Sequence, residues 1–544
     1  MTFERQHLNL HQRLPLKSDS CPAFLLCLIL GSILLFSTAG LCAAEKIIDP
    51  ETEVDILWAT SPQFKIDEAD LKRHITFLAS DSIEGRESGS RGGRAAAGYL
   101  VSELQKYGLQ PAAGSNDYYQ EFGSGYRNIL ALLPGSDPAL RDQVIMIGAH
   151  YDHVGYGNSQ NSLGPIGQIH NGADDNASGT SLLLELAQAF SEQNIKPKRS
   201  ILFAFWDAEE RGLVGSRHWI ANPTIDFDRV KFYFNYDMVG RLTANSLEVY
   251  GTRTATGLQR QLVRHNHSPS FRLVYNWDNK GDSDHFPFFS KRIPYLMLHT
   301  GKHEDYHRPS DDAHKINYEG ITQLTCFSAR LLWEEADQAE SISFRPESTS
   351  ETEFIRRGIQ TLNGTNPDRL GLTALPTSGN QDHIQVNQVL AGSPAAGVGL
   401  RSGDRILKFG DLPVGSLVFQ SLVLKAESPV EVTYIRPPSQ ERKKVLIRLN
   451  GKPQLLGISL HVDKAEPGSV RITRVRPGSP AQYAGLEKND IIWSVNDVWP
   501  LSQEEFFETL QSVPPDQKQL DLIIEREGQL QKIKVDLWPK PDSK

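Results

Sequence analysis

The sequence predicts an α/β domain whose sheet is covered by helices on both faces, followed by two small β-rich domains. Between residues 66 and 333, short runs that are apolar throughout alternate with amphipathic helical runs, which is typical of strands buried on both faces. The C-terminal part of the chain repeats itself at a fixed offset. In addition, the length of 544 residues exceeds the roughly 250 to 300 residues at which a single core stops growing, so several domains are expected.

The composition excludes several classes of protein. With 39% hydrophobic and 23% charged residues, the chain has the make-up of a folded soluble protein rather than of a disordered or fibrous one. The net charge of −9 provides no general basic field, so we expect no nucleic-acid partner. Four cysteines are too few for a disulfide scaffold.

The N-terminal segment has the layout of an export signal. Basic residues precede the apolar run 23–36 and small residues follow it, which predicts cleavage near residue 44. Residues 1–44 are then a signal peptide and residues 45–64 a variable lead. We expect an exported protein, periplasmic or extracellular. If the signal is not cleaved, residues 22–42 would anchor the chain in a membrane, which is the one way in which a membrane is expected to be involved.

The first folded domain is expected at residues 65–336. Its predicted strands are short and apolar on both faces, and its two clearest helices carry an apolar stripe at helical spacing. The predicted strands are residues 143–150, 201–207, 231–237 and 294–299, and the predicted helices are residues 177–190 and 318–333.

The C-terminal part consists of a linker and an internal repeat. Residues 337–352 are polar with few apolar side chains, which predicts a linker. Beyond it, ten residues recur without a gap at an offset of 86, among them Gly-Ser-Pro-Ala at 392–395 and 478–481. Such a repeat predicts two copies of one module, at residues 353–450 and 451–541.

Each copy begins with a short glycine-containing turn, LGLTAL at 370–375 and LLGISL at 455–460. The turn is followed by GSPAAGVGLRSGDRIL in the first copy and by GSPAQYAGLEKNDII in the second. In these features each copy resembles a PDZ domain of the kind found in exported bacterial proteases. The resemblance implies that peptide or protein C-termini bind at the turns, which contain Gly371, Leu372, Gly457 and Ile458. Alternatively, the copies are spacers or packing modules whose grooves are blocked by their own chain.

Five clusters of carboxylate and imidazole residues follow the predicted strands of the first domain. They are His150 with Asp152, residues 171–179, residues 207–210, Asp237, and the histidine-rich residues 299–311. Each cluster alone has a structural explanation, such as capping of a helix. Together, however, they are expected to converge, because the binding crevice of an open α/β sheet lies beyond the carboxyl ends of its strands. Imidazole and carboxylate ligands without cysteine suit zinc or a related divalent ion, and they are numerous enough for two ions.

Six ordered motifs carry a resemblance to a known family. GAHYDHVG, NGADDNASG, FWDAEERGLVGS, NYDMVG, SDHFPF and YHRPSDD, over about residues 65–335, are similar to motifs of the exported di-zinc aminopeptidases of the zinc exopeptidase clan, of the aminopeptidase Y type. The resemblance implies a mixed, mostly parallel central sheet with helices on both faces. It also implies a metallopeptidase that binds two Zn²⁺ ions per chain.

The resemblance further assigns roles to individual residues. His150 and Asp237 would hold one zinc and Glu210 and His307 the other, Asp175 would bridge them, Asp152 would support His150, Glu209 would be the general base, and Tyr306 would help to stabilise the oxyanion. His299 and His303 are rival imidazoles to His307. A non-proline cis peptide bond is expected after Asp175.

The expected substrates are peptides with a free amino terminus, hydrolysed at their first peptide bond. The nearest alternatives are a carboxypeptidase, which would need a cationic pocket supplied by Arg211, Arg241 or Arg308, and a glutaminyl cyclase-like enzyme. A cyclase uses one zinc, whereas His150 and Asp237 provide for a second ion. An alternative of another class is a peptide-binding adaptor with an inert peptidase domain, which the complete set of ligands and Glu209 argue against.

Overall fold

The computed structural model describes residues 62–538 except 115, 268–269, 366–367, 376–381, 415–418 and 515. The predicted signal peptide and most of the variable lead lie outside the described residues. Within the part of the chain that is described, no helix is both long enough and apolar enough to cross a membrane.

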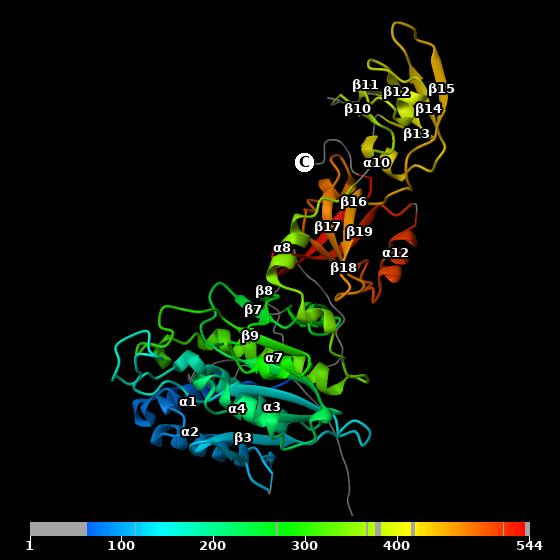
Figure 1. Ribbon diagram of the computed structural model, residues 1–544. Helices are drawn as coiled ribbons and strands as arrows, with labels where there is room; N and C mark the ends of the chain where they lie inside the picture. The colour runs from blue at the N-terminus through cyan, green and yellow to red at the C-terminus, as the bar shows by residue number, and fades with distance from the viewer. Residues whose placement is uncertain are drawn as a thin grey trace, which may run out of the picture. The chain divides into compact units, whose positions relative to one another are not determined.

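A mixed nine-stranded sheet forms the centre of the first domain (Figure 1). The strand order is β1-β3-β5-β4-β6-β9-β7-β8, and β2 pairs with β3. The central strands β5, β4, β6 and β9 are parallel, whereas β3 and β7 are antiparallel to their neighbours β5 and β9. The bounds are β1 (Gln110–Pro111), β2 (Tyr119–Phe122), β3 (Tyr126–Leu133), β4 (Val144–His150), β5 (Ser200–Trp206), β6 (Val230–Tyr236), β7 (Ser246–Tyr250), β8 (Arg272–Asn276) and β9 (Tyr295–His299). This confirms the predicted α/β class and the mostly parallel mixed sheet.

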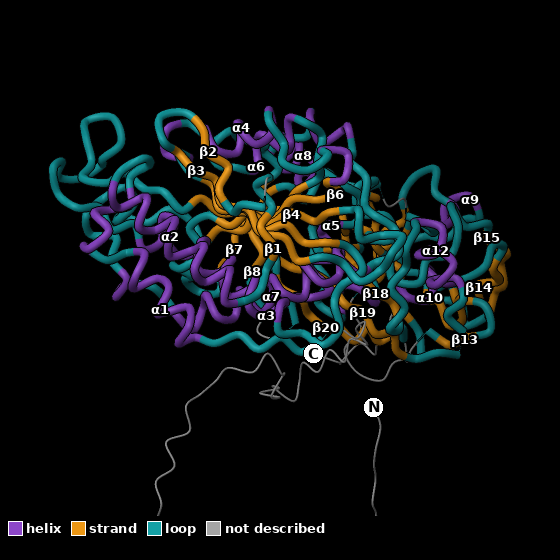
Figure 2. Tube along the Cα trace, turned by 90° about the horizontal axis from the view of Figure 1, so that it is seen from below, coloured by secondary structure: helices purple, strands orange, loops and turns teal. Residues whose placement is uncertain are grey.

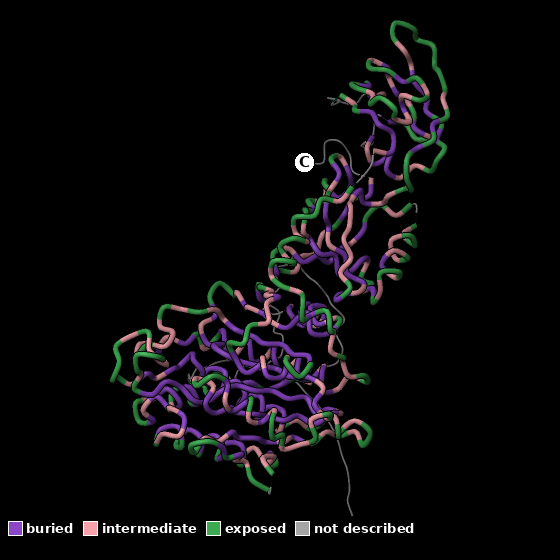
Figure 3. The backbone as a smooth tube through the Cα atoms, viewed as in Figure 1, coloured by how far each residue is buried: buried purple, intermediate pink, exposed green. Residues whose placement is uncertain are grey.

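Helices cover both faces of this sheet, because its central strands are apolar on both sides. Figure 2 shows α1 (Glu68–Leu78), α2 (Arg91–Lys106), α3 (Gly179–Ser191) and α7 (Tyr318–Asp337) on one side, and α4 (Val214–Ala221) and α6 (His285–Ser290) on the other. A helix α5 (Leu258–His265) follows β7. Two apolar clusters correspond to the two faces. The strands β4, β5 and β9 are buried at every residue, whereas the outer strands β1, β2, β7 and β8 are only partly buried (Figure 3).

The four predicted strands each agree with the structure to within one residue at either end. The predicted helix 177–190 starts later, at Gly179, because residues Ala173–Ser178 form a separate irregular helical turn, η2. The predicted helix 318–333 is correct at its start and continues to Asp337. Short helical turns also occur at η1 (Asp81–Arg86), η3 (Glu209–Arg211), η4 (Phe227–Arg229), η5 (Ala313–Lys315) and η6 (Pro346–Thr349).

The C-terminal repeat is confirmed by the recurrence of its elements at the predicted offset. β11 (Ile384–Val389), α9 (Pro394–Gly397) and β12 (Arg405–Phe409) recur as β17 (Val470–Val475), α11 (Pro480–Tyr483) and β18 (Ile491–Val495). Each copy is an antiparallel sheet of its own. The remaining elements are α8 (Glu353–Thr361), β10 (Leu372–Ala374), β13 (Leu412–Pro413), α10 (Phe419–Lys425), β14 (Val430–Ile435), β15 (Arg442–Ile447), β16 (Ile458–Val462), α12 (Gln503–Gln511), β19 (Gln519–Arg526) and β20 (Gln529–Asp536).

The two glycine-containing turns differ in one respect. Gly371 and Gly457 both adopt a left-handed backbone conformation, with φ of 76° and 77°, which favours glycine. In the first copy, however, the carboxylate of Asp368 accepts hydrogen bonds from the backbone N–H groups of Leu370 and Gly371 at 3.0 and 2.8 Å. The equivalent position of the second copy is Gln454. An internal carboxylate therefore occupies the turn of the first copy.

Candidate metal centre

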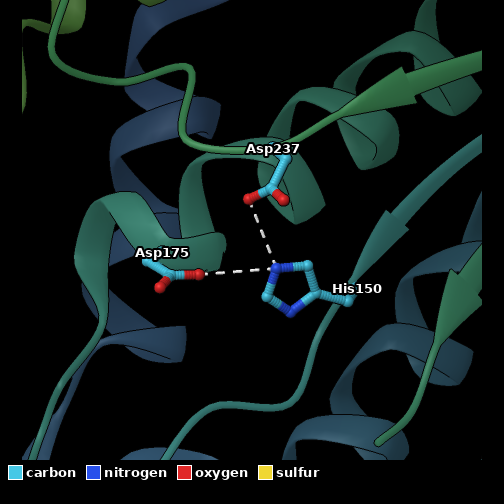
Figure 4. Close-up of side chains that lie close together, drawn as sticks. All are labelled: His150, Asp175 and Asp237. Carbon is cyan, nitrogen blue, oxygen red and sulfur yellow. Dashed lines mark hydrogen bonds and ion pairs between the residues drawn. The ribbon is translucent and has the colours of Figure 1, made fainter. Parts of the chain in front are cut away.

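The C-terminal edge of the large sheet brings two groups of potential metal ligands together. In the first group, His150 Nε2 lies 3.4 Å from Asp175 Oδ1 and 3.3 Å from Asp237 Oδ1 (Figure 4). His150 ends β4 and Asp237 follows β6, and these two strands are parallel neighbours. Parallel pairing therefore places both side chains at the same edge of the sheet.

The second group surrounds the other oxygen of Asp175. His307 Nε2 lies 3.1 Å from Asp175 Oδ2 and 3.1 Å from Glu210 Oε2. His153 Nδ1 lies 2.9 Å from Glu210 Oε1 and 3.9 Å from Asp175 Oδ2. The carboxylate of Asp175 thus belongs to both groups, with one oxygen facing each.

Asp175 is positioned by a buried arginine from a distant part of the sequence. Arg86 donates hydrogen bonds to the backbone oxygens of Asp175 and Gly172 at 3.0 and 2.6 Å. It also donates to three further carbonyls, those of Leu78, Tyr151 and Asn171. Five carbonyls on one guanidinium tie together the chain segments that meet at Asp175. The peptide bond after Asp175 is cis, which confirms that expectation.

A second carboxylate also holds this turn. Asp311 is buried and its Oδ2 accepts hydrogen bonds from the backbone N–H groups of Asp174 and Asp175 at 2.9 and 3.1 Å. Burial, together with the neighbouring carboxylate of Asp174, raises the pKa of Asp311 to about 7. His303, one of the rival imidazoles, bonds to Asp174 Oδ2 at 3.1 Å and lies outside both ligand groups.

The turn after β5 sends two consecutive glutamates in different directions. Ala208 has a φ of 58°, so the backbone reverses directly before Glu209. Glu210 faces the second ligand group, whereas Glu209 lines a cavity of about 340 Å³ together with His150 and Asp237. Burial and the nearby carboxylates of Asp284 and Glu210 raise the pKa of Glu209 well above its ordinary range, although His150 opposes this shift.

Asp152 connects Glu209 with His150. Its Oδ1 accepts a hydrogen bond from the backbone N–H of Glu209 at 3.0 Å, and its Oδ2 accepts one from the hydroxyl of Ser88 at 3.0 Å. His150 Nδ1 lies 3.7 Å from Asp152 Oδ1 and 3.2 Å from the backbone oxygen of Asp152. The residue is therefore in contact with His150, with the backbone carbonyl as the closer acceptor.

Two more side chains of the predicted site line the same cavity. The ring of Tyr306 stacks on His307 with centroids 4.0 Å apart. Burial and the carboxylates of Asp175 and Glu210 raise the pKa of Tyr306, which keeps the phenol protonated. His299, the other rival imidazole, also lines the cavity, and its Nδ1 accepts a hydrogen bond from the backbone N–H of Gly301.

The structure brings all predicted ligand residues of the first domain together and adds His153, which sequence reasoning missed. His153 follows Asp152 in the motif GAHYDHVG, three residues after the end of β4. The alternation of side chains along a strand therefore does not predict where the His153 side chain points. His153 is buried, and burial lowers the pKa of its imidazole well below the ordinary value. A neutral imidazole in this place donates to Glu210 from Nδ1.

We predict that the substitution H153F weakens zinc binding at the second group by about tenfold to a hundredfold, because the partners that orient metal ligands typically contribute this much. The first group should be affected less, because His153 approaches only its shared member Asp175, at 3.9 Å. Zinc titration against a competing chelator measures the zinc affinity of each of the two groups. Unchanged binding at both groups would contradict a role of His153 in holding Glu210.

Two family profiles match the chain. Residues 128–331 match Peptidase family M28, and residues 444–522 match the PDZ domain. The second match lies mostly in the second copy of the repeat.

Curated relatives are similar over part of their length. Leupeptin-inactivating enzyme 1 of Streptomyces exfoliatus is 30% identical over 292 residues, which are 53% of this chain and 60% of that protein. Aminopeptidase YwaD of Bacillus subtilis is 28% identical over 190 residues, which are 33% of this chain and 38% of that protein. The chain thus spans 60% or less of the length of these relatives.

Solved structures are also similar. The aminopeptidase from Aneurinibacillus sp. strain AM-1 has 18% sequence identity and a TM-score of 0.40, and the match covers 52% of this chain and 96% of that one. Glutaminyl cyclase of Porphyromonas gingivalis has 20% sequence identity and a TM-score of 0.41, and the match covers 49% of this chain and 98% of that one.

Proposed function

Because the chain contains a peptidase family M28 domain followed by a PDZ domain, we propose that it is a zinc-dependent aminopeptidase that hydrolyses the amino-terminal peptide bond of peptides. One observation carries this proposal. Two ligand groups share the carboxylate of Asp175, and Glu209 lies beside them in the same cavity.

The ligand set fits zinc. Imidazole nitrogens and carboxylate oxygens without a thiolate are ligands that zinc accepts, and two groups with one shared carboxylate suit a pair of ions. In this proposal His150 and Asp237 would hold one ion, Glu210 and His307 would hold the other, and Asp175 would contribute to both sites. When bound, zinc polarises the substrate carbonyl and makes water more acidic.

Glu209 acts as the general base and acid in this proposal. Its raised pKa suits a group that accepts a proton from the attacking water and then gives it to the leaving amine. Asp152 fixes the backbone of Glu209. Tyr306, which is protonated, is placed to donate a hydrogen bond to the oxyanion. The carboxylates of the cavity attract the substrate's free α-ammonium, which would restrict cleavage to chain ends.

Two of the three arginines near the motifs pair with carboxylates of the chain, which supports an aminopeptidase rather than a carboxypeptidase in this proposal. Arg211 pairs with Glu87 at 2.6 Å and Arg241 pairs with Asp305 at 2.5 Å, so both guanidinium groups already have a carboxylate partner within the chain. Arg308 is exposed. A cyclase-like activity is disfavoured because the first ligand group, with His150 and Asp237, provides for a second ion.

The proposal extends to the rest of the chain. The apolar segment 23–36 supports export to the periplasm or the exterior. Peptide C-termini are the proposed partners of the PDZ modules. The second copy is the better receptor of the two, because Asp368 already engages two N–H groups in the turn of the first.

Hydrolysis of aminoacyl p-nitroanilides by the full-length protein tests the function. We expect turnover that is lost on chelation and restored by zinc, and no turnover when the α-amine of the same anilide is acetylated. Equal hydrolysis of the acetylated anilide would contradict an aminopeptidase. Absence of turnover in folded protein that holds zinc would contradict a peptidase of this class.

A further inference from the structure

A row of polar side chains crosses three neighbouring strands beside the proposed catalytic site. In the sheet, β9 lies between β6 and β7. Tyr236 is paired with Leu298, and Glu248 is paired with His299. Asp237, one residue beyond Tyr236, therefore stands in line with His299 and Glu248. Strands lie about 4.8 Å apart, so Glu248 is about 10 Å from Asp237 across the sheet.

Glu248 is a fixed carboxylate in the wall of the cavity. It is half-buried, lines the cavity, and accepts a hydrogen bond from the hydroxyl of Tyr250 at 2.8 Å. Basic residues of the surrounding segments pair elsewhere: Arg241 and Lys315 with Asp305. Among the described residues, no lysine or arginine nitrogen lies within 4.0 Å of the Glu248 carboxylate. The Glu248 carboxylate is therefore available to a cationic group of a ligand in the cavity, and a charge-assisted hydrogen bond is stronger than a neutral one.

Among the described residues, the neighbouring imidazole of His299 forms no ion pair with Glu248. His299 is 7% exposed, and its Nδ1 accepts a hydrogen bond of 2.7 Å from the backbone N–H of Gly301. This hydrogen bond directs Nδ1 towards the backbone. In the register of the sheet, His299 lies between Asp237 and Glu248.

The lysines at the cavity are at its exposed rim. Lys280 and Lys302 both line the cavity but are exposed, as is Asp282. The Nζ of Lys302 lies 4.3 Å from the centroid of the Tyr306 ring. Solvent screens exposed charges strongly, so these side chains contribute little to selectivity compared with the half-buried Glu248.

We infer that this cavity recognises peptides whose amino-terminal residue has a basic side chain, with Glu248 binding its cationic end. The inference rests on the proposed aminopeptidase function, which places the α-carbon of that residue beside Asp237. An extended lysine side chain spans about 6 Å from Cα to Nζ, which bridges most of the distance to Glu248. Met297 and Tyr250 are paired across β9 and β7 and flank the path of its methylene groups.

Lysyl and norleucyl p-nitroanilides test this inference, because their side chains have the same methylene stem with and without the ammonium group. With zinc-loaded full-length protein, we expect kcat/KM to be at least about tenfold higher for the lysyl substrate. E248Q should lower the lysyl value about tenfold and leave the norleucyl value within about twofold. E304Q removes the same charge from an exposed residue that does not line the cavity, and should leave both values unchanged.

Three outcomes would overturn the inference. Equal or faster turnover of the norleucyl substrate by the unsubstituted protein would show that the ammonium is not recognised. An unchanged ratio of the two substrates in E248Q would exclude Glu248. Faster turnover of a glutamyl anilide would assign the selectivity to Lys280 and Lys302. In each case turnover of an uncharged substrate leaves the aminopeptidase function standing, whereas inactivity on every anilide would overturn both proposals.

Discussion

The substitution E209Q is expected to reduce kcat about a thousandfold while the protein keeps its zinc. General acid and base catalysis typically contributes a factor of about 10² to 10⁴, and glutamine can neither accept nor return the proton. The side chain is of nearly the same size, and Glu209 belongs to neither ligand group. Metal content should therefore be unaffected. Steady-state kinetics on an aminoacyl p-nitroanilide, combined with zinc analysis of the same preparation, measures both quantities.

The adjacent residue provides the matched comparison. Glu210 contacts His153 and His307, so E210Q should lower zinc affinity as well as activity. If E209Q instead lost zinc and E210Q retained it, the roles of the two glutamates would be exchanged. Near-normal activity of E209Q would exclude Glu209 as the base.

The substitution D175N is expected to have the second large effect, which is the loss of zinc from both ligand groups. Each oxygen of the Asp175 carboxylate faces one group, and an amide provides one oxygen without a negative charge. D237N should differ, because Asp237 belongs to the first group alone. We expect activity to fall at least about a thousandfold in D175N, with a larger drop in bound zinc than in D237N.

Zinc equivalents per chain after gel filtration, followed by reconstitution with increasing zinc, distinguish these cases. Equal zinc loss in the two variants would indicate that Asp237 also supports the second group. Full retention of zinc by D175N would contradict the shared position of Asp175. Circular dichroism of both variants controls for the fold.

The parts of the site that lie at strand ends could be predicted from the sequence. Apolar strands covered on both faces stand out as short runs, and the first polar residue after each run marks the edge where ligands meet. This pattern places His150 and Asp237 at that edge. Asp175 and His307, by contrast, lie in irregular turns, and their roles came from the resemblance of whole motifs.

Residues that hold the ligands could not be predicted in this way. His153 points into the site because the chain turns immediately after β4, and Arg86 does so from a turn in which Glu84 and Arg86 have positive φ values of 52° and 38°. Such backbone conformations produce no periodic pattern in the sequence. The hydrogen-bond acceptors of Arg86 are backbone carbonyl groups, which every residue possesses. The roles of His153 and Arg86 depend on hydrogen bonds that exist only in the folded chain.

The five carbonyls on Arg86 also bear on how short a self-sufficient fragment of the chain can be. The profile match begins at residue 128, but a fragment cut there would lack Arg86 and expose the apolar faces of α3 and α7 that α1 covers. The carbonyl of Asp175 would lose its donor, and the buried turn around it would be left with unsatisfied oxygens. Any fragment made for expression, crystallisation or transfer to another protein must therefore begin upstream of α1.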